Sequence, residues 1–261
     1  TRAKERQIDS IDAPRVKALT WSIPEPSSWY PTRVSSLLRC PRRTLLERFL
    51  KLEGPQLDIG LEQFTDSLWI GNMVHLIVER AARSIIGKVD SLDDFDRHIA
   101  NAARTELQMH EPSIDPAMQS ILHDSLTLRL SPLVDFVRSD RVHRIIGIEQ
   151  HLPDHDSPAI LRSKCDLIVE NTKGQRLLID LKSGATQSQK SLQDSEASGQ
   201  DLQRAAYLMG DPQAQEAAMF YLGGGAEPYV AVDRSGDQIA WAKEALKRAK
   251  LHVEFGAYPM T

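Results

Sequence analysis

Two aspartates and a lysine occur in a short stretch that could perform metal-dependent chemistry. Residues 161–184 (LRSKCDLIVENTKGQRLLIDLKSG) contain two runs rich in Leu, Ile and Val, separated by the turn-like residues 171–174. We therefore predict a β-hairpin with strands at 161–170 and 175–183. Because side chains alternate between the faces of a strand, Asp180 and Lys182 share one face of the second strand.

The length of the hairpin loop decides whether Asp166 joins them. If a three-residue loop with a left-handed Gly174 pairs residue 171 with residue 175, Asp166 lies opposite Asp180. A four-residue loop would pair Asp166 with Ile179 and separate the carboxylates onto opposite faces. Facing carboxylates repel each other and favour a cation between them. The alternative is a solvated outer strand on which Asp-x-Lys has no chemical role.

Two predicted helices carry further polar side chains at helical spacing. In the helix predicted over residues 61–87, Gly71, His75 and Glu79 are four apart and form one stripe beside an apolar face. His75 is either a packed core histidine or a metal ligand. Glycine is unfavourable inside a helix, so Gly71 indicates that another part of the chain approaches closely. Gln203 and Tyr207 face the same way in a helix predicted over residues 200–209.

The remaining pattern predicts a mixed α/β chain. We expect helices at 91–111 and 115–140, the second interrupted at Pro132, and a strand at 142–152 that carries a solvated Glu149. The polar segment 185–199 is expected to be a mobile loop beside the hairpin. Two short strands, at 217–222 and 229–232, and a last helix over 235–255 complete the pattern.

Length and composition indicate a globular chain with a large core. The chain has 261 residues, of which 41% are hydrophobic, and a formal net charge of −4, which is a weak guide to partners. Residues 1–31 are expected to be an extended lead or linker, and residues 32–261 a folded domain. Arg33, Arg39, Arg42 and Arg43 form the most basic stretch, which is either a phosphate-contacting surface or a solvated helix face.

The sequence also indicates where the protein is located and what its cysteines can do. No segment resembles a signal peptide or is long and apolar enough to span a membrane, so we expect a cytoplasmic protein without a membrane partner. The two cysteines, Cys40 and Cys165, provide neither a disulfide framework nor a four-ligand zinc site.

Five segments in order resemble the PD-(D/E)XK nucleases of the RecB and AddB type over about residues 32–256. They are RCPRR at 39–43, GNMVH at 71–75, Asp166, IDLKSG at 179–184 and QRAAY at 203–207. CRISPR-associated RecB-like nucleases share these segments. The resemblance implies a restriction-endonuclease-like fold, a mixed sheet of about five strands flanked by helices, with residues 88–140 as a helical insertion.

The resemblance also implies roles for individual residues. His75, Asp166, Asp180 and the backbone carbonyl of Leu181 would bind a divalent metal, and Lys182 would be the catalytic lysine. Gln203 and Tyr207 would orient the substrate strand or the lysine. A mostly oxygen ligand set with one imidazole favours Mg²⁺ or Mn²⁺.

The chain departs from the family pattern at two positions. Ser163 stands where a glycine usually precedes the first metal aspartate. Cys40 stands alone where many relatives have the first of four cysteines that hold an iron–sulfur cluster, so we expect no such cluster in this chain.

We therefore expect a metal-dependent deoxyribonuclease, exonuclease or endonuclease, that acts on single strands or DNA ends in recombination or repair. Its expected partners are DNA and a helicase domain or subunit. The alternatives are a CRISPR-associated RecB-like nuclease, a catalytically inactive DNA-binding scaffold, and a metal hydrolase with another substrate. The residues do not distinguish DNA from RNA as the substrate.

Overall fold

A five-stranded mixed sheet forms the centre of the molecule. The computed structural model describes residues 29–49, 51, 67–88, 92–152, 161–225 and 227–254. Within them the strands are β1 (Arg144–Leu152), β2 (Ser163–Glu170), β3 (Arg176–Lys182), β4 (Ala214–Tyr221) and β5 (Tyr229–Asp233), in the spatial order β1-β2-β3-β4-β5. Only the β3–β4 pairing is parallel in this sheet. The predicted mixed sheet of about five strands is confirmed.

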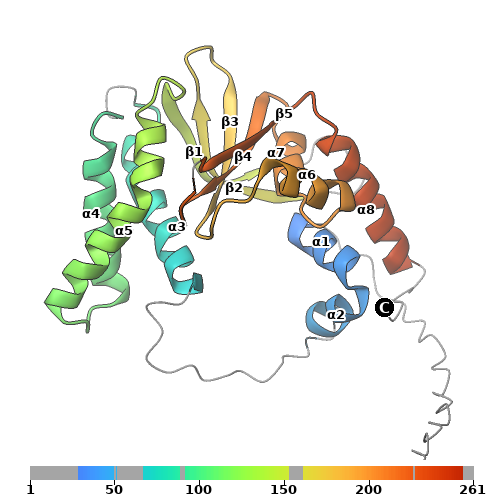
Figure 1. Ribbon diagram of the computed structural model, residues 1–261, viewed down its shortest axis with the longest axis horizontal. Coiled ribbons are helices and arrows are strands. Elements are labelled where there is room, and N and C mark those ends of the chain that lie inside the picture. Colours follow the sequence, from blue (N-terminus) through green and yellow to red (C-terminus); the bar gives the residue numbers. More distant parts are fainter. Residues whose placement is uncertain are drawn as a thin grey trace, which may run out of the picture.

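Helices cover both faces of this sheet (Figure 1). One group contains α3 (Ser67–Ile85), α4 (Phe95–His110) and α5 (Pro116–Val137). The other contains α1 (Pro31–Arg39), α2 (Pro41–Thr44), the π-helix η1 (Leu45–Phe49), α6 (Gln189–Ser198), α7 (Gln203–Gly210) and α8 (Gln238–Glu254). The parallel β3–β4 pair requires a crossover, and α6 and α7 provide it.

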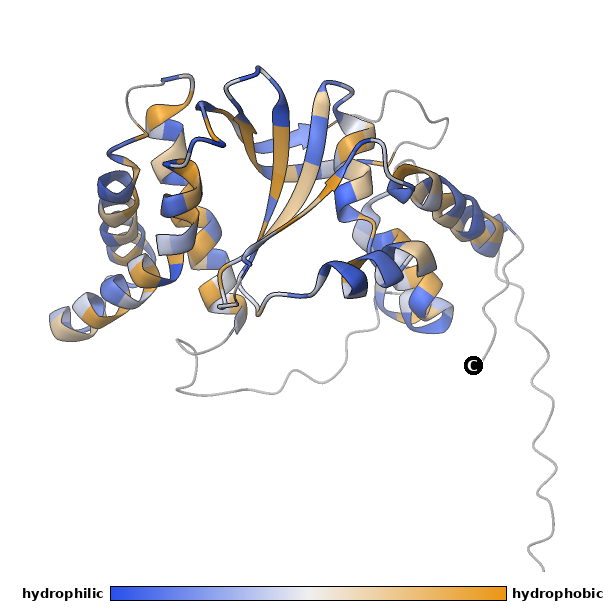
Figure 2. Cartoon of the chain, turned by 45° about the horizontal axis from the view of Figure 1, so that its top comes forward, coloured by the Kyte–Doolittle hydropathy of each residue, from blue (hydrophilic) through white to orange (hydrophobic). Residues whose placement is uncertain are grey.

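Alternation along the strands builds two cores. Leu177, Ile179 and Leu181 of β3 pack with α3, α4 and α5, whereas Leu178 packs with α7 on the other face. Figure 2 shows apolar residues along the central strands and hydrophilic residues in the loops at their ends. Because both faces are covered, a charged side chain on β3 is buried unless it lies near the end of the strand.

The central hairpin has the register predicted for a three-residue loop. The N–H of Asn171 donates to the carbonyl oxygen of Gln175 at 3.0 Å, and Gly174 has a φ of 73°. Leu167 pairs with Ile179 in this register. Continued by one residue, the register places Asp166 opposite Asp180.

Two predictions about secondary structure are wrong. Helix α5 continues through Pro132, because the buried Leu130, Leu133 and Val137 hold this segment against the core although proline removes one backbone hydrogen bond. Residues 189–198, expected to lie in a mobile loop, form α6. Its ends carry ordinary caps: the Ser188 hydroxyl accepts from the Ser191 N–H, and a left-handed Gly199 follows.

The predicted lead over residues 1–31 lies largely outside the described residues. Trp29, the first residue that the structure describes, is 1% exposed and forms a parallel bridge with Leu161. The folded body therefore includes residue 29, three residues before the predicted start of the domain at residue 32. No helix in the described ranges is both long and apolar enough to cross a membrane.

Candidate active site

Three acidic residues lie in a row across the first three strands. Ile148 pairs with Leu167 and Gln150 with Cys165, so the register places Glu149 opposite Asp166. Asp166 in turn lies opposite Asp180 on β3. Asp166 and Asp180 are 8% and 4% exposed. Such a row of buried carboxylates requires compensating cations or protons.

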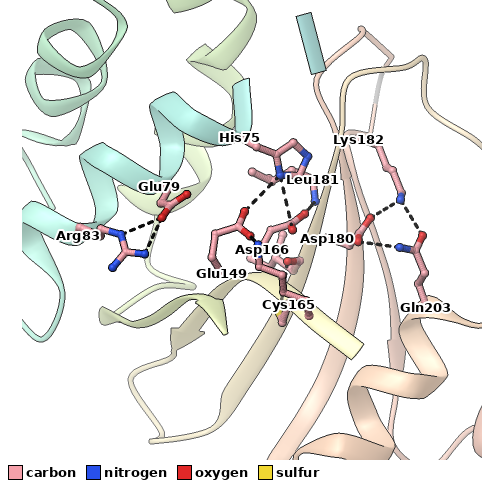
Figure 3. Close-up of polar contacts among 12 residues, drawn as sticks. His75, Glu79, Arg83, Glu149, Cys165, Asp166, Asp180, Leu181, Lys182 and Gln203 are labelled. Carbon is pink, nitrogen blue, oxygen red and sulfur yellow. Dashed lines mark hydrogen bonds and ion pairs between the residues drawn. The ribbon is translucent and has the colours of Figure 1, made fainter. Parts of the chain in front are cut away.

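Two members of this row, Glu149 and Asp166, lie together with His75 of α3 (Figure 3). These three residues are called the metal-ligand group. Nδ1 of His75 lies 3.5 Å from Oε1 of Glu149 and 3.6 Å from Oδ1 of Asp166. One ligand atom from each residue lies within 4.8 Å of the others. One imidazole and two carboxylates are suited to a divalent cation such as Mg²⁺ or Mn²⁺.

Helix α3 can bring His75 to the sheet because Gly71 lets it approach β3. A Cβ atom at Gly71 would lie 3.3 Å from Oγ of Ser183, just after the end of β3. His75 follows one helical turn later and faces Asp166. The close approach predicted from Gly71 is therefore confirmed. Glu79 of the same stripe pairs instead with Arg83, 2.5 Å from its Nη2.

Glu149 is the member of this group that sequence reasoning missed. It was expected to be solvated at the end of a strand, but its side chain is 12% exposed and faces His75. Its backbone has a φ of 48°, a left-handed conformation that is uncommon for residues other than glycine. This conformation lies at the candidate site, where such outliers are often found.

Asp180 belongs to a second set of contacts, the lysine group, defined as Asp180, Lys182, Gln203 and Tyr207. Nζ of Lys182 lies 2.6 Å from Oδ2 of Asp180 and donates to Oε1 of Gln203 at 2.7 Å. Nε2 of Gln203 donates to Oδ1 of Asp180 at 3.2 Å, and the Tyr207 hydroxyl lies 2.5 Å from the same oxygen. The structure therefore brings together the four residues that sequence reasoning placed beside one another.

The arrangement differs from the expected ligand set in two respects. The carboxylate of Asp180 contacts the lysine group and lies outside the metal-ligand group. Leu181 contributes its backbone N–H, which donates to Oδ2 of Asp166 at 2.7 Å. The roles of Asp180 and of the Leu181 carbonyl as metal ligands remain predictions.

Burial and neighbouring charges shift the pKa values of Asp166 in the metal-ligand group and of Lys182 in the lysine group. Burial, followed by the charge of Asp180, raises the pKa of Asp166 to about 7. Burial by itself lowers the pKa of Lys182, but the adjacent Asp180 carboxylate raises it more, and the net pKa lies above the ordinary lysine value. Lys182 is therefore an ammonium ion near neutral pH, whereas Asp166 binds a proton more readily than an ordinary aspartate does, and a metal ion would compete with that proton.

A cavity of about 740 Å³ opens beside the metal-ligand group. Its lining includes His75, Glu149, Asp166 and Lys164, together with residues from the start of α3 and from the end of α4. The metal-ligand group thus lies where a small ion and part of a larger anionic substrate can reach it together.

The predicted basic residues lie on α1 and α2, and one of them approaches the lysine group. Arg33 and Arg39 belong to α1, and Arg42 and Arg43 to α2. Nη2 of Arg39 donates to the carbonyl oxygen of Gln200 at 3.4 Å, just before α7, which carries Gln203. Arg43 pairs with Glu47 at 2.7 Å, so part of its charge is already compensated.

A match to a family model agrees with this geometry. Residues 28–257 match the family model of the PD-(D/E)XK nuclease superfamily. The comparison with curated proteins gave no match. Among solved structures, the crystal structure of SSO0001 is similar at 14% identity and a TM-score of 0.36, over 88% of this chain and 78% of that chain. The match to the family model covers most of the residues, and the chain belongs to the PD-(D/E)XK nuclease superfamily.

Proposed function

We propose that this chain hydrolyses phosphodiester bonds of DNA, in single strands or at DNA ends, with Mg²⁺ or Mn²⁺. The observation that carries the proposal is the adjacency of the two groups: Asp166 of the metal-ligand group lies opposite Asp180, which holds Lys182. Superfamily membership supports metal-dependent nuclease activity. Its use in recombination or repair, with a helicase domain or subunit as partner, is part of the same proposal.

The residues of the metal-ligand group fit a divalent cation. His75, Glu149 and Asp166 would hold it, since they offer one nitrogen and two carboxylates within reach of one ion. When bound, the cation lowers the pKa of a water molecule and neutralises charge on the phosphate. The N–H of Leu181 fixes Oδ2 of Asp166, which leaves Oδ1 directed toward His75.

Lys182 acts as a positioned cation in this proposal. Because its pKa is raised, its ammonium group stays charged near neutral pH and is better suited to stabilise negative charge on the phosphate than to accept a proton from water. Gln203 and Asp180 hold Nζ from two sides. Tyr207 fixes Asp180 in turn, so the ammonium group needs little reorganisation during the reaction.

The two sides of the site suit an anionic nucleic-acid strand, and the experiment below separates DNA from RNA. The cavity opens next to the metal-ligand group, and Arg39 of α1 contacts Gln200, just before the helix that carries Gln203. Exposed arginines such as Arg42 and Arg43 suit phosphate contacts.

The test compares labelled single-stranded DNA, duplex DNA and RNA side by side with Mg²⁺, with Mn²⁺ and with EDTA. We expect cleavage of single-stranded DNA with either metal, and no cleavage with EDTA or by Asp180→Ala. Asp124→Ala is the matched control, because Asp124 lies on α5 with its side chain 78% exposed. Cleavage by Asp180→Ala, or by the wild type in EDTA, at the rate of the wild type with metal would refute the proposal, and faster cleavage of RNA would refute the substrate class.

A further inference from the structure

Lys164 occupies one oxygen of a carboxylate that a metal ion would need. Its Nζ forms an ion pair with Oε2 of Glu149, whereas Oε1 of Glu149 faces His75. The Lys164 side chain is 50% exposed and the Glu149 side chain 12% exposed. The lysine therefore reaches from the open cavity into the metal-ligand group.

The ion pair and a bound dication are in conflict. A divalent cation at His75, Glu149 and Asp166 would repel the ammonium group that contacts the same carboxylate. The ammonium group that contacts Glu149 already supplies a positive charge at that carboxylate, so the lysine acts as a competing cation. Because a lysine side chain is long and flexible, Nζ can leave Glu149 without movement of β2.

The backbone of Lys164 is held by strand pairing, whereas half of its side chain is exposed. Lys164 pairs with His151 across β1 and β2, and its carbonyl oxygen lies 2.9 Å from the Tyr207 hydroxyl. The side chain also lines the 740 Å³ cavity beside the metal-ligand group. An ammonium group displaced from Glu149 would thus remain in the space where the substrate would lie.

We infer that Lys164 is an internal counter-ion of the metal site: it pairs with Glu149 when no metal is bound, is displaced by a divalent cation, and then pairs with a substrate phosphate in the cavity. This inference rests on the proposed function, which supplies the metal and the phosphodiester. Full binding of the nucleic acid then requires bound metal, because the Lys164 ammonium group pairs first with Glu149 and can pair with a substrate phosphate only after the metal has displaced it.

The test measures two affinities of Lys164→Gln, whose predicted changes have opposite signs. Calorimetric titration with Mn²⁺ alone should show binding about three- to tenfold tighter than in the wild type, because the competing ammonium group is gone. Anisotropy with a labelled phosphorothioate single strand in saturating Mn²⁺ should show binding about three- to tenfold weaker, because one phosphate contact is lost. A purely structural role of Lys164 would not move the two affinities in opposite directions.

Two variants serve as controls. Lys164→Arg keeps a positive charge and should stay close to the wild type in both titrations. Lys173→Gln removes a lysine from the exposed hairpin loop and should change neither affinity. Equal thermal midpoints of Lys164→Gln and Lys173→Gln show that both variants are folded.

The outcomes separate this inference from the proposed function. If the wild type binds Mn²⁺ and cleaves DNA, but Lys164→Gln binds Mn²⁺ with equal or lower affinity, the competition is refuted and the proposed function stands. Unchanged affinity of Lys164→Gln for the single strand likewise refutes the phosphate contact. If the wild type neither binds Mn²⁺ nor cleaves DNA, the proposed function fails first.

Discussion

The raised pKa of Asp166 predicts how the stability of the metal-free protein depends on pH. Asp166 is 8% exposed, and burial together with Asp180 raises its pKa from 3.8 to about 7. The folded protein therefore binds this proton more tightly than the unfolded chain does. The resulting stabilisation is complete below about pH 4 and is lost as the pH rises through 7. The shift corresponds to about 4 kcal/mol of unfolding free energy.

Asp166→Asn isolates this effect, because an asparagine stays neutral at every pH and its amide oxygen can still accept the Leu181 N–H. We expect the variant and the wild type to have similar unfolding free energies near pH 4. At pH 8 in EDTA the variant should be more stable by up to about 4 kcal/mol, a large part of the stability of a typical domain.

Urea denaturation at intervals between pH 4 and pH 8 measures this difference directly. Saturating Mn²⁺ at pH 8 should stabilise the wild type more than the variant, because the ionised Asp166 carboxylate attracts the cation more strongly than a neutral amide does. If the unfolding free energies of the wild type and of Asp166→Asn change equally between pH 4 and pH 8, the pKa of Asp166 is not raised. The account of the acidic row would then be wrong.

Two further predictions concern the lysine group. Lys182→Met should lower the cleavage rate by about 100-fold or more, while calorimetry should show that Mn²⁺ binding is retained. Lys173→Met, in the exposed hairpin loop, is the control and should cleave normally. Equal losses of cleavage rate and of metal affinity in Lys182→Met would contradict the role of Lys182 as a positioned cation. Tyr207→Phe removes the hydroxyl next to Oδ1 of Asp180 and should lower the unfolding free energy by about 1.5–3 kcal/mol in urea denaturation. Tyr221→Phe should cost less, because that buried hydroxyl contacts a methionine sulfur at 3.8 Å; equal costs would show that the Asp180 contact is weak.

The core of the site could be predicted from local sequence because short-range rules fix it. The loop at residues 172–174 allows few geometries, and its register places Asp166 opposite Asp180. Helical spacing placed Gly71 and His75 on one stripe, and the cost of glycine in a helix indicated the close approach to β3. Each of these inferences needed only residues of one hairpin or one helix, which are close in the sequence.

The place of Glu149 depended on the tertiary structure. The register between β1 and β2 spans the connection at residues 153–160, whose length sets no register, and the left-handed backbone at Glu149 is not encoded by a glycine. The same holds for α6: its buried Glu196 pairs at 2.7 Å with Arg204 of α7, a contact between segments that look polar in isolation. Pro132 stays inside α5 because the packing of that helix offsets the lost backbone hydrogen bond.

The sequence by itself determined which residue types are available for chemistry and which of them share a face. The tertiary structure decided their division into two groups, with Asp166 beside His75 and Glu149, and Asp180 beside Lys182. The physical reason is that alternation and helical periodicity fix direction within an element, whereas contact between elements depends on packing across the whole core.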